Sequence, residues 1–111
     1  MDVPITIGKL RHRVQLQELT AGTPDGHGHV APEWTEIDEL WAAVEPKGAS
    51  ETIRADRLAA DTTHAVTLRF REGVKPDQQI LFGTRELNIT KVWNVEERDV
   101  VLVLECIEQV N

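Results

Sequence analysis

The run VVLVLECIEQV at residues 100–110 constrains the fold more than any other part of this 111-residue sequence. It is almost continuously apolar over a length typical of a β-strand, and a strand with apolar side chains on both faces must be covered on both. The cover can come from the interior of a closed barrel or from a neighbouring subunit. The only cysteine, Cys106, lies in this run, which excludes a disulfide within the chain and predicts a buried, unreactive thiol.

Alternation of apolar and polar residues with a period of two predicts further strands along the chain. Residues 12–19, 33–46 and 64–71 form three of them. Residues 78–93 hold two short strands around a turn at residues 83–85. The side chains expected on the inner faces are Val14, Leu16, Val66, Leu68, Phe70, Ile80, Phe82, Leu87 and Ile89.

Two connections between these strands differ in composition from the rest. Residues 20–32, TAGTPDGHGHVAP, contain three glycines and two prolines, which predicts a long and mobile hairpin loop. Residues 51–60 place apolar side chains at roughly helical spacing, with Ser50 as N-cap and Glu51 in the first turn. We therefore expect a short helix there, held by tertiary contacts because so few turns are marginal alone.

These elements predict an all-β fold, a small antiparallel β-barrel of about six strands with one short helix in a strand connection. The sheet must close, or pair with another chain, because strands this few and short otherwise leave their edges open. A chain of 111 residues builds one core, so we expect residues 1–111 to form a single domain with a flexible N-terminus at residues 1–8. The N-terminal sequence MDVPITIGKLRHR lacks the apolar run of a signal peptide, and no stretch approaches the ~20 apolar residues of a membrane span.

The charge balance and the absence of catalytic motifs argue against most enzyme classes and against a protein whose main task is to grip nucleic acid. Nineteen acidic residues against twelve basic ones give a net charge of −7, whereas phosphate binding needs local positive charge. The sequence contains no Gly-rich phosphate loop, no Cys-x-x-Cys and no Gly-x-Ser-x-Gly. We therefore expect a protein that is not an enzyme and has no cofactor.

Four histidines are the best candidates for a metal site. His27 and His29 are separated by one glycine and could contact the same ion. A zinc site needs three or four ligands, and His12 and His64 lie on expected strands with no evident convergence. We therefore expect no metal, and interpret His27 and His29 as polar loop residues.

The carboxylates favour a solvated surface over a catalytic site. A catalytic acid needs an apolar pocket that raises its pKa, and six acidic residues lie instead in turns or on solvated strand faces. Arg69, Arg71 and Lys75 could form a small basic site, so a nucleic-acid-binding barrel of the OB type stays an alternative. The six acidic residues are Glu36, Asp38, Glu39, Glu96, Glu97 and Asp99.

Three tryptophans are divided between core and surface. Trp41 and Trp93 are expected in the core, because large aromatic side chains in a small barrel usually fill its interior. Trp34 borders the expected loop, so we place it either at the edge of the core or at an interface.

Five consecutive segments carry a resemblance to a known family. They are IGKLRHRVQLQ, PDGHGH, EWTEIDELWAAVEP, GASETIRADRLAADTTHAVTLRFREGVKPDQQIL and FGTRELNITKVWNVEERDVVLVLECIE. Within them, the order and spacing of GKLRHR, W-A-A-V-E-P, T-H-x-V-x-x-R and E-R-x-x-x-L-x-L-E-C is fairly specific. Over about residues 7–108 the chain resembles the head-closure proteins of long-tailed bacteriophages, also called head–tail joining or stopper proteins.

The resemblance implies a small β-barrel that forms a ring below the portal and adaptor of a filled capsid, helps to retain packaged DNA and offers a docking face to the tail. It implies that residues 46–63 reach toward the channel or a neighbouring subunit. It also implies that the N-terminal segment and residues 20–32 contact adjoining rings. The residues expected to face the channel or a neighbour are Ser50, Glu51, Thr52, Arg54, Asp56 and Arg57, and those of the second contact are Asp25, Gly26, His27, Gly28, His29 and Trp34.

The partners implied are further copies of the chain in a homo-oligomeric ring, portal and adaptor proteins, tail completion proteins, and packaged DNA held without sequence specificity. No membrane is involved, and the free protein is expected to be a monomer. The location implied is the head–tail junction of the virion, of a phage or prophage, and the cytoplasm of the bacterial host during assembly. An acidic chain suits a DNA channel, because it repels the duplex and lets it slide. Two alternatives stay open: the OB-like module, and a small hydrolase or metal-dependent enzyme around His27 and His29.

Overall fold

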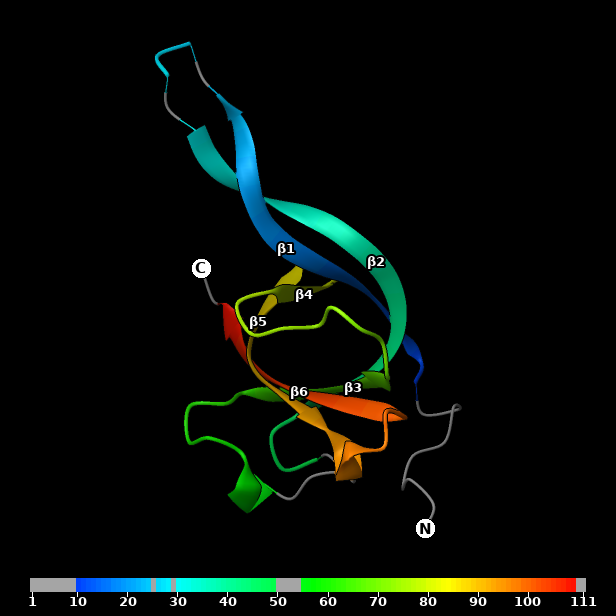
Figure 1. Cartoon of the computed structure of the whole chain (residues 1–111). Coiled ribbons are helices and arrows are strands. Elements are labelled where there is room, and N and C mark those ends of the chain that lie inside the picture. The colour runs from blue at the N-terminus through cyan, green and yellow to red at the C-terminus, as the bar shows by residue number, and fades with distance from the viewer. Residues whose placement is uncertain (1–9, 25, 29, 50–54, 110–111) are drawn as a thin grey trace.

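Six antiparallel strands form one closed sheet in the computed structural model, which describes residues 10–24, 26–28, 30–49 and 55–109 (Figure 1). The all-β barrel expected from the sequence is therefore confirmed. The strands are β1 (His12–Pro24), β2 (Val30–Pro46), β3 (His64–Arg69), β4 (Gln79–Phe82), β5 (Arg85–Asn94) and β6 (Val101–Gln109). Two 3₁₀ turns, η2 (Ala55–Arg57) and η3 (Val95–Glu97), complete the described elements.

The barrel closes through a short seam between its first and fourth strands. The strand order around the barrel is β1-β2-β3-β6-β5-β4, and β4 returns to β1. Only three residue pairs make this seam, at Gln15–Leu81, Leu16–Ile80 and Gln17–Gln79. Closure removes the open edges that strands this short would otherwise expose.

The barrel interior is filled by alternate residues of every strand, because successive side chains of a strand point to opposite faces. All nine side chains expected on inner faces belong to this core or pack against it, Phe70 and Phe82 being partly buried. The Cys106 thiol is also there, fully buried, and burial raises its pKa to about 12. The expectation of a buried thiol is thus confirmed.

The apolar run of β6 is covered on both faces by this chain itself. Leu102, Leu104 and Cys106 point into the barrel, while Val103 on the outer face packs against Leu58 and Ala65 in a second cluster. Trp93 and Val95 border this second cluster. Leu58 follows η2 in the connection between β2 and β3, so the cover of the outer face comes from that connection.

The first hairpin departs most from expectation, because its strands continue through the predicted loop. β1 runs to Pro24 and β2 begins at Val30, so residues 25–29 alone connect them, and the long loop at residues 20–32 is wrong. Gly22 shows why the composition misled: a Cβ built there would lie 2.2 Å from the Ala31 carbonyl oxygen, so glycine permits close approach of the two strands. The glycine marks a tight ribbon here, and not a loop.

Of the expected helix at residues 51–60, the structure describes residues 55–60. Ala55–Arg57 form a single 3₁₀ turn, and residues 58–60 are not helical, so the predicted α-helix is wrong over this described part. Residues 50–54 lie outside the described residues, as do residues 1–8. Within the described part of the chain, no helix has the length and apolar character needed to cross a membrane.

Two tryptophans occupy positions that the sequence did not predict. Trp41 is 54% exposed, so its expected place in the core is wrong; Leu40 and Ala42 beside it face inward, and alternation turns Trp41 outward. Trp93 is partly buried, but in the outer cluster. The pairing of β5 with β6 skips Thr90, and this bulge reverses which residues face inward, so that Val92 packs on the core and Trp93 faces out.

Replacing Leu104 by Ala should lower the free energy of unfolding by about 2–5 kcal/mol, since it removes a fully buried side chain from the barrel core. Leu19→Ala is the matched control, because that side chain is 53% exposed on the first hairpin and should cost less than about 0.5 kcal/mol. Urea unfolding of both variants measures the difference. Equal losses would contradict the assignment of the core to the barrel interior.

Candidate interaction site

The connection between β2 and β3, residues 47–63 and hereafter the excursion, is tied to the barrel at both ends. The Lys47 backbone N–H donates to the Thr63 carbonyl oxygen over 2.9 Å, which closes the base of the excursion. The Lys47 ammonium reaches across to the Ala59 carbonyl at 2.8 Å. The Thr63 N–H donates to the Cys106 carbonyl of β6 over 2.9 Å. These bonds hold its described part against the outer face of the barrel.

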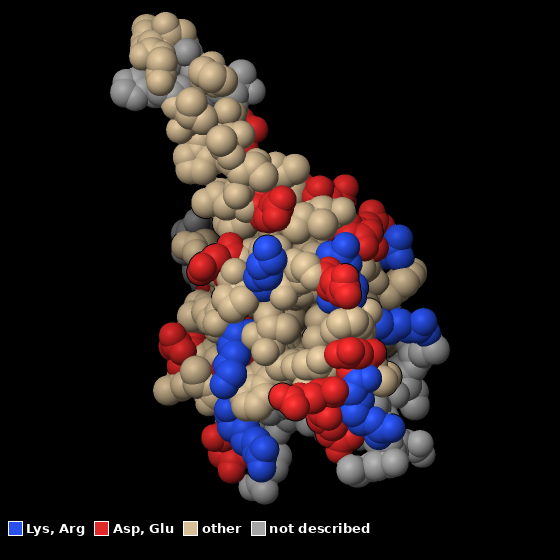
Figure 2. Space-filling view, in the orientation of Figure 1, with Lys and Arg blue, Asp and Glu red and all other residues tan. Residues whose placement is uncertain are grey.

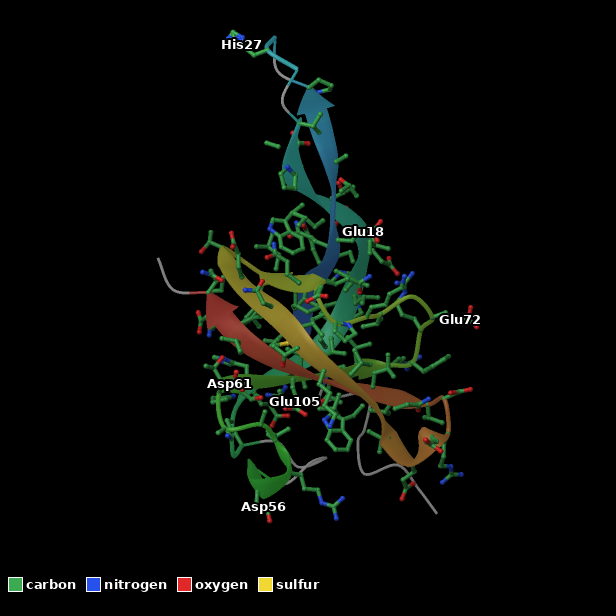
Figure 3. The ribbon with its side chains drawn as sticks, turned by 60° about the vertical axis from the view of Figure 1, so that its left-hand side comes forward. Glu18, His27, Asp56, Asp61, Glu72 and Glu105 are labelled. Carbon is green, nitrogen blue, oxygen red and sulfur yellow. The ribbon has the colours of Figure 1, made fainter. Side chains whose placement is uncertain are left out.

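A buried carboxylate on β6 fastens the middle of the excursion. Glu105 is 1% exposed, and its Oε1 accepts hydrogen bonds from the Ala59 backbone N–H and the Thr62 hydroxyl, both 2.9 Å long. Its Oε2 accepts the indole N–H of Trp93, whose ring lies 4.1 Å from the Lys91 ammonium. Figure 3 shows Glu105 on the side of the barrel nearest the excursion. One side chain thus joins the excursion, β5 and β6.

The environment of Glu105 keeps it ionised. Burial alone raises the pKa of this carboxyl, because a charge is costly away from water. The hydrogen bonds from Ala59, Trp93 and Thr62, together with the nearby Lys91 charge, outweigh burial and hold the pKa of Glu105 below its ordinary value. The carboxylate is therefore charged at neutral pH and fully hydrogen-bonded, the form in which a buried acid stabilises a fold.

A second polar cluster connects the end of the excursion to the C-terminal end of β6. The Glu108 backbone N–H donates to the Thr63 hydroxyl over 2.7 Å. The guanidinium of Arg85 binds both Glu108 carboxylate oxygens at 2.9 Å, and this hydrogen bonding lowers the pKa of Glu108. His64 lies beside them, and burial lowers its pKa despite the Glu108 charge. Thr63 is therefore held from two sides.

The anchored excursion turns its charged residues outward. Asp56 and Arg57 of η2 are exposed, while Leu58 next to them is 7% exposed and packs on the barrel. Asp56 is drawn in Figure 3 at the far side of the excursion from Glu105. Of the six residues expected to face a channel or neighbour, Ser50, Glu51, Thr52 and Arg54 lie outside the described residues, so the structure locates only the other two.

The first hairpin forms a second projecting surface. The pairing of β1 with β4 ends at Gln17, and the pairing of β2 with β3 begins at Ala42. Residues 18–24 and 30–36, hereafter the arm, therefore have no third strand beside them and extend from the barrel as a two-stranded ribbon (Figure 1). The molecule is consequently elongated, with extents of 56 × 26 × 23 Å.

The arm exposes apolar side chains and carries the second expected contact at its end. Leu19, Val30 and Trp34 are 53%, 47% and 38% exposed. Gly26, His27 and Gly28 are exposed at the tip, where Figure 3 labels His27. Asp25 and His29 lie outside the described residues. Trp34 is thus on the arm and away from the core, and its place at an interface stays a prediction.

The residues of the alternative hypotheses are described only in part, because His29 lies outside the described residues. Among them, no three His, Cys, Asp or Glu side chains come together as a metal site would require. His12 accepts the Val44 backbone N–H at its Nδ1 over 3.1 Å, and its ring packs against Phe82 in a tilted arrangement, which gives it a structural role. In the expected basic site, Arg71 forms an ion pair with Asp38 at 3.5 Å.

Sequence reasoning missed Glu105, the carboxylate on which the excursion depends. It is one charged residue within an apolar run, and that position was the available signal. The sequence could not supply its donors, because Ala59 and Thr62 are more than forty residues away and the bulge at Thr90 is needed to aim Trp93 at it.

Comparisons with known proteins find a matching family and solved structures of similar fold, two of which follow. Residues 5–109 match the model of a family described as phage head completion protein. The solution structure of protein SF1141 from Shigella flexneri 2a has a TM-score of 0.68 and 25% sequence identity, over 96% of this chain and 99% of that one. A chain from the virion of a native gene transfer agent particle has a TM-score of 0.62 and 21% identity, over 91% and 96%. No curated protein matches this sequence.

Replacing Glu105 by Gln should destabilise the fold on the order of 1–3 kcal/mol at neutral pH, because the amide has one accepting oxygen and leaves the N–H of either Ala59 or Trp93 without an acceptor. The lowered pKa of Glu105 means that its ionised form stabilises the fold at pH above its ordinary value, and that this contribution disappears as the pH falls through the lowered one. The difference between wild type and variant should therefore shrink in acid. Urea unfolding across pH measures it.

Glu108→Gln is the matched control, because Glu108 lies on the same strand but pairs with Arg85 at the surface. Its effect at neutral pH should be much smaller, since exposed ion pairs contribute little. An equal loss of stability in the two variants would contradict the role assigned to Glu105.

Proposed function

We propose that this chain, which belongs to the family of phage head completion proteins, forms a ring at the head–tail junction. The ring lies below the portal and adaptor of a filled capsid. There it helps to retain packaged DNA and presents a docking face to the tail. It acts by assembly and not by catalysis. The family match over residues 5–109 is the observation that carries the proposal, because it includes the whole barrel, the arm and the excursion.

The excursion has the features of a surface that meets a channel or a neighbour. It is held firmly by Glu105 and Thr63, so the position of η2 relative to the barrel is defined. Asp56, Arg57 and Asp61 are exposed on it. A surface that is fixed in place and carries exposed charged side chains is suited to contacts in a particle. Ser50, Glu51, Thr52 and Arg54 complete the surface in this proposal.

The arm suits contacts with adjoining components, because apolar side chains on a projecting ribbon stay exposed to water in a lone molecule. Its partners in this proposal are further copies of the chain, portal and adaptor proteins, and tail completion proteins. Packaged DNA passes the ring without sequence-specific contacts, and the net charge of −7 favours sliding of the duplex over binding. Assembly takes place in the cytoplasm of the bacterial host.

A stop codon early in this gene, within the phage or prophage genome that encodes it, should yield heads that fill with DNA and then lose it. Free tails should accumulate beside them, because the docking face is missing. Electron microscopy and nuclease protection of the packaged DNA measure both effects, and a plasmid copy of the gene should restore infectious particles. Normal particle yields without the chain, or heads that never fill, would contradict this function.

Charge reversal at Arg57 separates assembly from folding. Arg57→Glu should reduce DNA retention or particle yield while changing the free energy of unfolding by less than roughly 0.5 kcal/mol, as expected at an exposed position. Lys75→Glu, exposed in the turn before β4, is the matched control and should leave particle yield unchanged. Thermal unfolding and particle counts measure the two effects. A loss of stability that parallels the loss of particles would show that Arg57 acts on the fold.

A further inference from the structure

Charge is divided unevenly along this chain, and the division follows the first hairpin. Residues 14–46 contain seven acidic residues and no lysine or arginine. The other residues contain twelve acidic and twelve basic residues, which cancel. The whole net charge of −7 therefore belongs to the segment that forms β1 and β2, from just inside the barrel to the tip of the arm and back.

On the arm itself the acidic residues gather at the base, and the outer part is nearly uncharged. Between Leu19 and Pro32 the only charged residue is Asp25. Figure 2 shows acidic side chains where the arm leaves the barrel and neither sign on the described residues of its outer part, whereas both signs mix over the barrel. Glu18, Glu33 and Glu36 are the acidic residues of the base, and all are exposed. None of the three has an ion-pair partner among the described residues.

Next to this acidic base lies the exposed apolar pair of the arm. Leu19 and Trp34 are directly opposite each other in the strand register, so their side chains share one face of the ribbon. They are 53% and 38% exposed. Glu36 lies on the same face, two residues from Trp34, whereas Glu18 and Glu33 lie on the other face. The arm thus presents an apolar face with one carboxylate beside it, and an apolar face on a projecting ribbon is the kind of surface that another molecule covers.

The barrel of the same chain carries a surface of the complementary kind. A pocket of about 510 Å³ opens beside the start of β1. Leu10, Leu40, Trp41 and Leu68 line it with apolar surface, and Arg13, Glu39 and Arg69 complete its lining. Arg13 forms an ion pair with Glu39, and its guanidinium lies 4.9 Å from the centroid of the Trp41 ring. Arg69 has no ion-pair partner among the described residues. Arg11, exposed next to Leu10, has none there either.

We propose that the arm of one copy docks into this pocket of a second copy, with Leu19 and Trp34 on its apolar wall and Glu36 beside Arg69 and Arg11. The match is one of apolar surface to apolar surface and of negative charge to positive charge. It rests on the proposed function, since it names the contact between subunits of the ring.

The geometry makes this a contact between molecules and sets its symmetry. Leu19 and Arg13 are six residues apart on the same strand, about 20 Å at roughly 3.3 Å per residue, so an arm cannot fold back onto its own pocket. Arm and pocket are different surfaces, so each copy that receives an arm still offers its own to the next. Such head-to-tail contacts close into a ring when the rotation per copy allows it.

Disulfide trapping tests the contact in assembled particles. Ala21→Cys places a thiol on the same face of β1 as Leu19, and Arg11→Cys places one beside the pocket, while the buried Cys106 gives no background. Both variants are expressed together in place of the wild-type chain, and purified particles are oxidised and run on a non-reducing gel. We expect a dimer that links the two variants and is absent when either is present alone. Asp61→Cys, near the opposite end of β3, is the matched control and should give no dimer with Ala21→Cys.

Charge reversal adds a second readout. Arg69→Glu in the Arg11→Cys variant should lower the dimer yield by up to roughly fivefold, and Glu36→Lys in the Ala21→Cys variant should restore part of it. Particles that contain both variants but give no dimer above the Asp61→Cys control would overturn the arm–pocket contact, and would point to an adjoining component as the partner of the arm. Particles that lack the chain altogether would overturn the proposed function instead.

Discussion

The carboxylate of Glu105 is the interaction on which the outer half of this structure depends. It is buried and charged, and such a group is tolerated only when its oxygens are well hydrogen-bonded. The donors come from the excursion and from Trp93 on β5, so the excursion must lie against β6 as long as Glu105 is ionised. With the excursion in place, Leu58 covers Val103 and Ala65, and the outer face of β6 is shielded from water.

A barrel built in this way is filled inside by its own side chains. Its closing seam is short and its interior is occupied by alternating side chains. What the molecule presents are two extensions, an anchored excursion with outward charges and an arm with exposed apolar residues. A small protein of a phage head is expected to have this division, because rigid extensions on a stable core give contacts that form only when neighbours are present.

Several features were predictable because they depend on local pattern. Alternation placed Val14, Leu68 and Ile89 on inner faces, and the apolar run at the end of the chain indicated a strand covered on both sides. Other features were not, because they depend on cross-strand geometry. The glycine and prolines of residues 20–32 are typical of a loop in isolation, yet paired strands accommodate them in a ribbon. Trp41 faces outward only because Leu40 and Ala42, its neighbours on β2, face inward.

The amino-acid sequence by itself determined the all-β class, the inner faces of the strands, the buried cysteine and the family resemblance, since each is written in residue order and period. Tertiary structure alone decided where the buried charge of β6 finds its donors, which face Trp93 occupies after the bulge at Thr90, and how far the arm projects. The physical reason is the same in each case. A hydrogen bond to a buried carboxylate, a shift of register and a strand without a third neighbour are relations between distant segments, and they exist only once the barrel has closed.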